Sequence, residues 1–339
     1  MKTARFWEPA PGRAVVCHLC PHQCRIAAGG RSRCFGRVNH DGTLIAETWG
    51  YPVAMQVDPI EKKPLHHFLP GTPVLSLGTL GCNLKCRFCQ NWELSHPGAA
   101  APRAGAQVLP EEVAAAAIRG AIPSVAATYN EPAVWAEYAM DIADACHAKG
   151  LRMVAVTSGF FSAEPRLEFF RKMDAANVDL KSFRDDFYRQ LCGGRLAPVL
   201  ETLEAIRLET DCWLEVTTLL VPGQNDSDAE LDELTAWVAG HLGEETPLHF
   251  SAFHPDGEMR DVPPTPVATL QRAREHARRN GLMHVYEGNV RGEEDATATF
   301  CPECGARLVE RAGFQARVTG LDADGRCTTC GRACAGVWK

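Results

Sequence analysis

The segment Gly81–Asn91, which reads GCNLKCRFCQN, constrains this chain more than any other stretch. Its cysteines, Cys82, Cys86 and Cys89, have the spacing C-x3-C-x2-C. Three thiolates this close can hold three corners of a cubane iron–sulfur cluster and leave the fourth iron open to a substrate or cofactor. The alternative is a zinc knuckle or a set of buried free cysteines. The strand-like run Val74–Leu80 directly before the loop favours the cluster.

Composition narrows the class of protein. The chain has 339 residues, 45% of them hydrophobic and 23% charged, as in ordinary globular proteins. Its net charge of −7 argues against a surface for nucleic acid. The N-terminus has no apolar core of the kind that a signal peptide needs, and no apolar run reaches the length of a membrane span. We therefore expect a cytoplasmic protein that binds neither nucleic acid nor a membrane.

Most of the fifteen cysteines fall in three groups, and reduced cysteine pairs of this kind indicate metal more often than disulfides. The first group has the spacing C-x2-C-x3-C-x9-C and predicts a zinc site or a second cluster; it consists of Cys17, Cys20, Cys24 and Cys34. The last group has the spacing C-x2-C-x22-C-x2-C and predicts a zinc-ribbon or rubredoxin-like tail that holds zinc or iron; it consists of Cys301, Cys304, Cys327 and Cys330. Outside the groups, Cys146 is expected to pack in the core.

Between these groups, strand-like and helix-like stretches alternate. The expected strands are Val74–Leu80, Ser124–Tyr129, Met153–Thr157, Val178–Leu180, Trp213–Val221 and Leu248–Phe253. Several are continuous apolar runs, as parallel strands covered on both faces must be. Six strand–helix units predict an α/β fold, a partial (β/α)6 TIM-like barrel. We expect a Cys-rich N-terminal region without regular structure (residues 1–70), the barrel (71–293) and a Cys-rich ribbon (294–339).

Polar residues follow the expected strands, where a β/α barrel carries its chemistry. They are Asn130, Glu131, Ser158, Asp179, Lys181, Thr217 and His254. Each one alone is explained as a helix cap or a turn residue. Their recurrence on the rim that also carries the Gly81–Asn91 loop favours a site. Within that loop, Phe88 is placed to pack against a bound nucleoside.

The C-x3-C-x2-C loop after a first barrel strand resembles the radical S-adenosylmethionine (SAM) superfamily. Almost the whole chain is similar to one branch, the radical SAM protein of the AmmeMemoRadiSam system, which is related to pyruvate formate-lyase-activating enzymes. The matching segments are CHLCPHQC, DPIEKKPLHHFLPG, TLGCNLKCRFCQNWELS, TYNEP, DLKSF, VPGQND, FHPD, DVPPTP, VYEGN and the final cysteine pairs. The resemblance implies a [4Fe–4S] cluster on Cys82, Cys86 and Cys89 that cleaves SAM reductively. The resulting 5′-deoxyadenosyl radical would abstract hydrogen from an unidentified substrate, such as a protein partner of an activase-like enzyme.

The resemblance also implies roles for the rim residues. Glu131 would hold the SAM amino group, and Asp179 and Lys181 would lie near the SAM carboxylate and ribose. Asn130, Ser158, Thr217 and His254 occupy further positions that contact SAM or substrate, although Thr217 stands where the formate-lyase activases carry an arginine. A reductant such as ferredoxin or flavodoxin is expected as a partner, together with Memo-type and AMMECR-type proteins.

Two other functions compete with this interpretation. One is a non-catalytic iron–sulfur and zinc protein that transfers electrons or serves as a scaffold. The other is a zinc-ribbon module that binds nucleic acid, which the acidic balance disfavours. An electron carrier has no need of Glu131, Lys181 and His254 around its cluster, so the rim favours an enzyme.

Overall fold

One large sheet organises the computed structural model, which describes residues 1–98, 105–290 and 294–339. Its eight strands have the order β14-β13-β12-β11-β10-β9-β8-β7. The bounds are β7 Ala54–Pro59, β8 Pro73–Gly78, β9 Ser124–Ala127, β10 Arg152–Thr157, β11 Ala175–Asp179, β12 Trp213–Leu220, β13 Leu248–Ala252 and β14 Val285–Gly288. Strands β8 to β14 are parallel, and β7 pairs antiparallel with β8. The sheet is open between β7 and β14, which confirms the α/β partial barrel.

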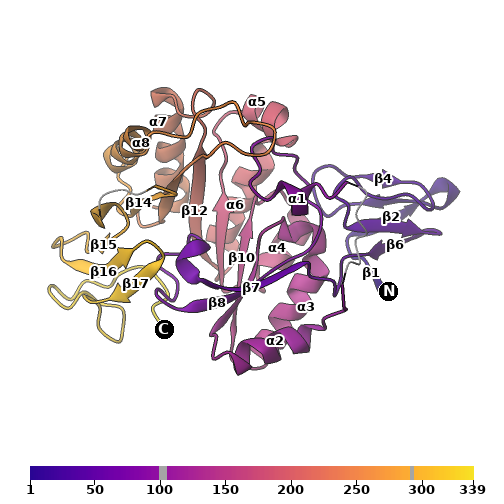
Figure 1. The fold of residues 1–339 in the computed structure, drawn as a ribbon, viewed down its shortest axis with the longest axis horizontal. Helices are drawn as coiled ribbons and strands as arrows, with labels where there is room; N and C mark the ends of the chain where they lie inside the picture. Colours follow the sequence, from indigo (N-terminus) through magenta and orange to yellow (C-terminus); the bar gives the residue numbers. More distant parts are fainter. Residues whose placement is uncertain (99–104, 291–293) are drawn as a thin grey trace.

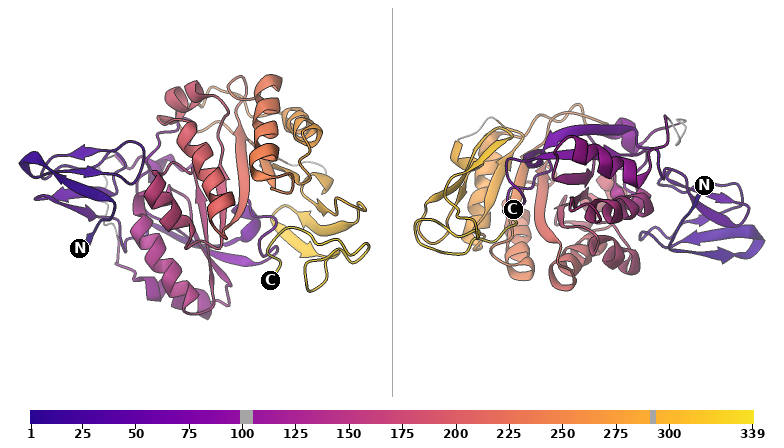
Figure 2. Two further views of the ribbon diagram at one scale, coloured as in Figure 1. Left: turned by 180° about the vertical axis from the view of Figure 1, so that it is seen from behind. Right: turned by 90° about the horizontal axis from the view of Figure 1, so that it is seen from below.

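The helices also follow the expected pattern. The main ones are α2 Pro110–Arg119, α3 Ala136–His147, α4 Ala163–Phe170, α6 Ala197–Glu209, α7 Asp228–Trp237 and α8 Val267–Arg279. They cover one face of the sheet (Figure 2). Proline suits the first turn, where its missing N–H leaves no hydrogen bond unmade, and Pro110 begins α2. Ser227 caps α7 by accepting a hydrogen bond from the Glu230 N–H. None of the helices in the described residues is long and apolar enough to cross a bilayer.

The expectation that residues 1–70 lack regular structure is wrong. Residues 2–46 form two small antiparallel sheets at one end of the molecule (Figure 1), and β7 belongs to the main sheet. One contains β2 Trp7–Ala10, β3 Ala14–Cys17 and β4 Arg25–Ile26, and the other contains β1 Lys2–Thr3, β6 Thr43–Ala46 and β5 Arg37–His40. A buried ion pair of 2.8 Å between Arg37 and Glu137 joins this region to α3. These strands escaped prediction because they are two to four residues long, too short to show a periodic pattern.

The C-terminal ribbon consists of β15 Thr299–Phe300, β16 Arg307–Ala312 and β17 Gln315–Val318. It lies at the end opposite the two small sheets (Figure 1). The ribbon and the tail after it contact both edges of the open barrel. On the β7–β8 side, the Leu69 N–H donates to the Val337 carbonyl at 2.7 Å. On the β14 side, the Tyr286 and Thr299 hydroxyls are 2.8 Å apart. The ribbon therefore closes the side of the barrel that the sheet leaves open.

Candidate functional site

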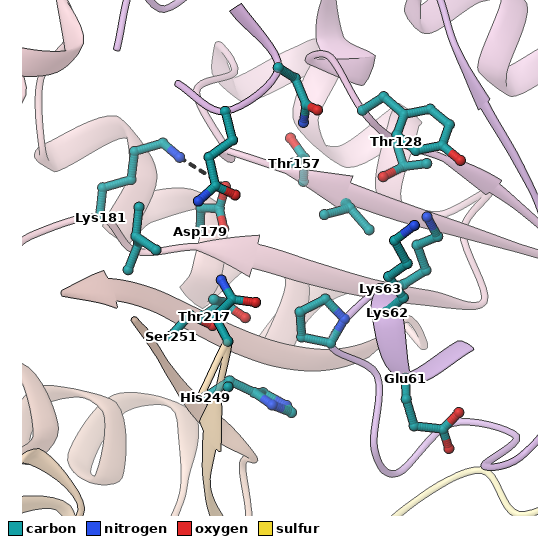
Figure 3. Close-up of a pocket in the computed structure, with 18 of the residues that line it drawn as sticks. Glu61, Lys62, Lys63, Thr128, Thr157, Asp179, Lys181, Thr217, His249 and Ser251 are labelled. Atoms are coloured by element: carbon teal, nitrogen blue, oxygen red, sulfur yellow. Dashed lines mark hydrogen bonds and ion pairs between the residues drawn. The ribbon is translucent and has the colours of Figure 1, made fainter. Parts of the chain in front are cut away.

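A cavity of about 990 Å³ lies at the carboxyl ends of the parallel strands. It is lined by most of the residues that the sequence singled out: Cys82, Cys86, Phe88, Cys89, Asn130, Glu131, Ser158, Asp179, Lys181 and Thr217. Figure 3 shows several of them, with Asp179 and Lys181 joined by an ion pair of 2.8 Å. His254 is not among the lining residues. It is exposed, and its Nε2 lies 3.0 Å from the Asn289 carbonyl.

The cysteine loop between β8 and α1 (Trp92–Ser95) is held by backbone contacts. The Lys85 N–H donates to the Cys192 carbonyl at 2.7 Å, and the Arg87 N–H donates to the Leu191 carbonyl at 2.9 Å. Gly81 opens the loop with a φ of +97°, and an added Cβ would collide with the Cys34 carbonyl. Only glycine fits there, because it alone tolerates both the backbone conformation and the close approach. The loop is therefore fixed from both sides.

Asn130 fixes the approach to this loop. Its Oδ1 accepts hydrogen bonds from the Thr79 N–H and the Trp135 indole, and its Nδ2 donates to the Gly81 carbonyl at 2.7 Å and to the Thr79 hydroxyl. A carboxamide has two donor hydrogens and two acceptor sites, so this side chain is fully used. Its visible role is to position the loop, and contact with a bound ligand remains a prediction.

The carboxylate of Glu131 is equally occupied. Thr157 and Ser158 donate through their hydroxyls at 2.5 and 2.6 Å, and the backbone N–H groups of Ser158 and Ala133 donate at 2.7 and 3.1 Å. A carboxylate has about four acceptor positions. An ammonium group of a ligand can therefore bind Glu131 only if a donor turns away, and the Ser158 hydroxyl is free to rotate.

The thiols of the loop fit a metal cluster. A hydrogen bond from the Cys192 thiol lowers the pKa of Cys86, burial opposes this, and the positive charge of Lys181 lowers the pKa further. Burial raises the pKa of Cys82 well above its usual value, and the charge of Glu131 adds to the effect. Iron must therefore displace the Cys82 proton when it binds. No sequence pattern links Cys192 to the loop, because it lies more than a hundred residues away.

Phe88 is 3% exposed and lies in the cavity wall. Its ring centroid is 5.7 Å from that of Phe187. One side of the ring is thus packed against α5 (Asp185–Phe187). Only the part of the ring that faces the cavity can make the predicted contact with a nucleoside.

The four ribbon cysteines form a metal site by geometry. The sulfurs of Cys301, Cys304, Cys327 and Cys330 all lie within 4.8 Å of one another, the only group of this kind in the described residues. Two sulfur–sulfur separations are 3.6 and 3.7 Å. A tetrahedral ion with metal–sulfur bonds of about 2.3 Å requires a separation of roughly 3.8 Å. Hydrogen bonds from the Cys330 and Thr329 backbone lower the pKa of Cys327 to about 6, which favours the thiolate that a metal needs. The group can hold zinc or iron.

The N-terminal cysteines lie beside the cluster loop without converging in this way. Burial raises the pKa of Cys17, Cys20 and Cys34. The segment touches the loop through the Cys34 carbonyl, and His22 Nε2 lies 2.8 Å from the Asn83 carbonyl. A second metal or cluster at these cysteines remains a prediction.

A cluster of buried histidines lies below the rim. His66 and His67 follow the turn η2 (Ile60–Lys62), His249 comes from β13, and His284 precedes β14. Burial is the main cause that holds the pKa of His66 and His67 well below the usual range. Burial likewise lowers the pKa of His284 to about 4, against the opposing charges of Glu245 and Glu215 and with the charge of Arg332. The rings of His66, His67 and His284 are therefore neutral in the folded protein at neutral pH.

Stability should therefore fall in mild acid. The unfolded chain takes up protons on these histidines near pH 6.5, whereas the folded chain does not. The stabilisation is fully present above about pH 6.5 and is lost as the pH falls toward the folded pKa. For His284, the stability lost by pH 4 amounts to roughly 3 kcal/mol. The midpoint of urea unfolding should fall between pH 7.5 and pH 5. The fall should be less steep in His284→Gln. It should be as steep as in the wild type in the exposed control His40→Gln. Equal slopes in all three proteins would refute the assignment.

Comparisons with known proteins identify the family to which this fold and site belong. The sequence pattern of the radical SAM superfamily matches residues 77–235, which include the cysteine loop and the strands up to β12. The uncharacterised protein MJ0808 of Methanocaldococcus jannaschii is 43% identical over 333 residues, 98% of each chain. The chain belongs to the radical SAM superfamily. Membership implies a [4Fe–4S] cluster and SAM as cofactors, and the thiols of Cys82, Cys86 and Cys89 are the donors that such a cluster uses.

Two further relatives are more distant. The benzylsuccinate synthase activating enzyme of Thauera aromatica is 25% identical over 130 residues, 38% of this chain and 39% of that protein. A radical SAM methyltransferase from Sphaerobacter thermophilus has a similar structure, with a TM-score of 0.50 and 20% identity over 71% of each chain. The structural likeness shows the same fold. Glycyl-radical activases are thus distant relatives of this radical SAM chain.

Proposed function

We propose that this protein is a radical SAM enzyme that cleaves SAM reductively and uses the 5′-deoxyadenosyl radical to abstract hydrogen from a substrate. The observation that supports this best is the shared cavity. The three thiols of the cysteine loop face the same space as Glu131 and the Asp179–Lys181 pair. When bound, the cluster and SAM supply the one-electron chemistry, and the chain supplies binding, orientation and exclusion of water.

The residues divide this work. Cys82, Cys86 and Cys89 hold the cluster in the proposal, and the loop backbone keeps them in place. Glu131 accepts a hydrogen bond from the SAM amino group after the Ser158 hydroxyl turns away. Lys181 lines the same cavity, is held at 2.8 Å by Asp179 and offers a cation to a ligand carboxylate. Thr217 has a buried hydroxyl without a partner and lines the cavity, so it is available to a ligand.

Within the superfamily, we assign the chain to the AmmeMemoRadiSam branch. The support is the set of segments that flank the cysteine loop, among them TYNEP and DLKSF. A flavodoxin or ferredoxin is the proposed electron donor, as activases use such reductants. Memo-type and AMMECR-type partners are further expectations of this assignment.

The test is direct. Protein reconstituted with iron and sulfide under anaerobic conditions is mixed with SAM and dithionite, and 5′-deoxyadenosine is measured. The proposal predicts its formation. A cluster-loaded sample that yields no 5′-deoxyadenosine, and is no more active than Cys86→Ala, would favour the electron-transfer or scaffold function instead.

A further inference from the structure

Three buried polar atoms without hydrogen-bond partners meet at one wall of the cavity. They are Glu61 Oε2, His66 Nδ1 and Arg311 Nε, from the turn η2, the segment that follows it and strand β16 of the ribbon. Glu61 is 3% exposed, His66 8% and Arg311 5%. Buried polar atoms are nearly always paired, because an unmade hydrogen bond costs about 1–3 kcal/mol. Three such atoms from separate segments, all in the lining of one cavity, indicate a ligand that supplies the missing partners.

The wall lies deeper in the barrel than the proposed SAM contacts. Along β12, Glu215 precedes Thr217 by two residues, and along β13, His249 precedes Ser251 by two. Side chains two residues apart on a strand share a face and lie roughly 6.6 Å apart. His249 therefore faces the cavity one layer below Ser251. Figure 3 shows Glu61 and His249 together, below Asp179 and Lys181.

The other groups of this wall are firmly held. The Glu215 carboxylate accepts the backbone N–H groups of His66 and His67 at 2.9 and 2.7 Å, and it lies 2.7 Å from His249 Nε2. Arg311 donates from its Nη2 to the His66 carbonyl at 2.6 Å and from its Nη1 to Thr299 at 2.8 Å. Such fixed groups are preorganised to bind, because little conformational freedom is lost when the ligand arrives.

We propose that Glu61, His66, His249 and Arg311 form the substrate subsite, and that its ligand is a small molecule with a carboxylate next to a hydroxyl or amino group. The Arg311 Nε–H offers a charged donor to a carboxylate oxygen. Glu61 Oε2 offers an acceptor to a hydroxyl or ammonium hydrogen. The other oxygen of Glu61 is 3.9 Å from Arg311 Nε, so donor and acceptor are adjacent, as the two groups of such a ligand are. This inference rests on the proposed function, since it gives the substrate of the same cavity.

The enclosure favours a small molecule over a polypeptide. The ribbon closes the open side of the barrel, and its residues Arg311 to Phe314 form part of the cavity lining. A protein loop would have to displace the ribbon to reach His249, which is 3% exposed. A cavity of about 990 Å³ is at the upper end of the size that small-ligand pockets have, which leaves room for a cofactor and a small substrate.

The experiment measures glycolate and glycine binding by calorimetry to cluster-loaded protein with SAM present. The variants are Glu61→Gln, which keeps the shape of the side chain, and Arg311→Lys, which keeps its charge. Arg307→Lys is the matched control, because Arg307 lies on the same strand with its side chain 39% exposed. Metal content of the ribbon and SAM affinity report folding. We expect binding of both probes to the wild type, weakened about tenfold or more in the two variants and unchanged in the control.

Several results would overturn the subsite. One is that neither probe binds the wild type, and another is that all variants bind the probes equally well. A third is that methylammonium, which lacks the carboxylate, binds the wild type as tightly as the two probes. Preferential binding of a glycine-containing heptapeptide, weakened by the same variants, would replace the small molecule with a polypeptide. If glycolate binds as expected but no 5′-deoxyadenosine forms, the subsite stands and the proposed radical chemistry fails.

Discussion

Replacement of Cys86 with alanine is expected to lower 5′-deoxyadenosine formation by at least about a thousandfold, to the detection limit. The middle cysteine of the loop is the ligand whose thiolate the chain favours most, through Cys192 and Lys181. Two remaining thiols cannot hold the cubane with one open iron, and amino-acid side chains alone do not supply the one-electron chemistry. The assay is the anaerobic reaction with SAM and dithionite, quantified by chromatography.

Metal analysis of Cys86→Ala tests whether the effect of the substitution is confined to the cysteine loop. The ribbon can hold a metal through four sulfurs that are separate from the loop, so Cys86→Ala should lose the loop iron and keep the ribbon metal. Cys146→Ala is the matched protein, because it removes a buried thiol of α3 that does not line the cavity. It should retain both metals and the activity. Loss of the ribbon metal in Cys86→Ala would show that the sites are not independent.

Glu131→Gln is expected to weaken SAM binding about 10- to 100-fold with little change in cluster iron. The substitution removes the charged acceptor that would receive a hydrogen bond from the SAM amino group, and hydrogen bonds to charged groups are worth more than neutral ones. It also brings an NH2 group against Thr157 and Ser158, which now donate to the carboxylate. SAM titration of the cluster-loaded protein gives the affinity.

The exposed residue Glu164 on α4 provides the comparison for this test. Glu164→Gln removes the same charge outside the cavity and should leave the affinity unchanged. If Glu131→Gln binds SAM as tightly as this control, Glu131 serves only to shape the turn at Thr157–Ser158. Glu131 would then resemble Asn130, whose hydrogen bonds all stay within the chain and position the backbone.

The sequence predicts those features that short stretches encode. Cys82, Cys86 and Cys89 lie within eight residues, so their convergence needs only one loop. The apolar runs of the parallel strands are similarly local, and they place Asp179 at the rim as expected. His249 carried a signal too. It shares its phase along β13 with Ser251, whereas His254 follows the end of the strand and does not line the cavity.

Other features depend on contacts that no local pattern contains. Arg311 reaches the cavity wall from the ribbon, 245 residues beyond its hydrogen-bond partner His66. Cys192 meets the cluster loop through the turn η4 (Tyr188–Cys192), which the apolar pattern did not reveal. Strand β7 joins the main sheet although its residues alternate too weakly to predict a strand. Each of these contacts is set by how the barrel and the ribbon pack.

Electron paramagnetic resonance of the reduced, iron-loaded protein, recorded with and without SAM, tests the central claim most directly. A cluster held by Cys82, Cys86 and Cys89 would leave one iron without a side-chain ligand, open to the SAM amino and carboxylate groups. The spectrum of the wild type should therefore change when SAM is added, and Cys86→Ala should show no such signal. An identical spectrum of the wild type at saturating SAM would contradict this arrangement.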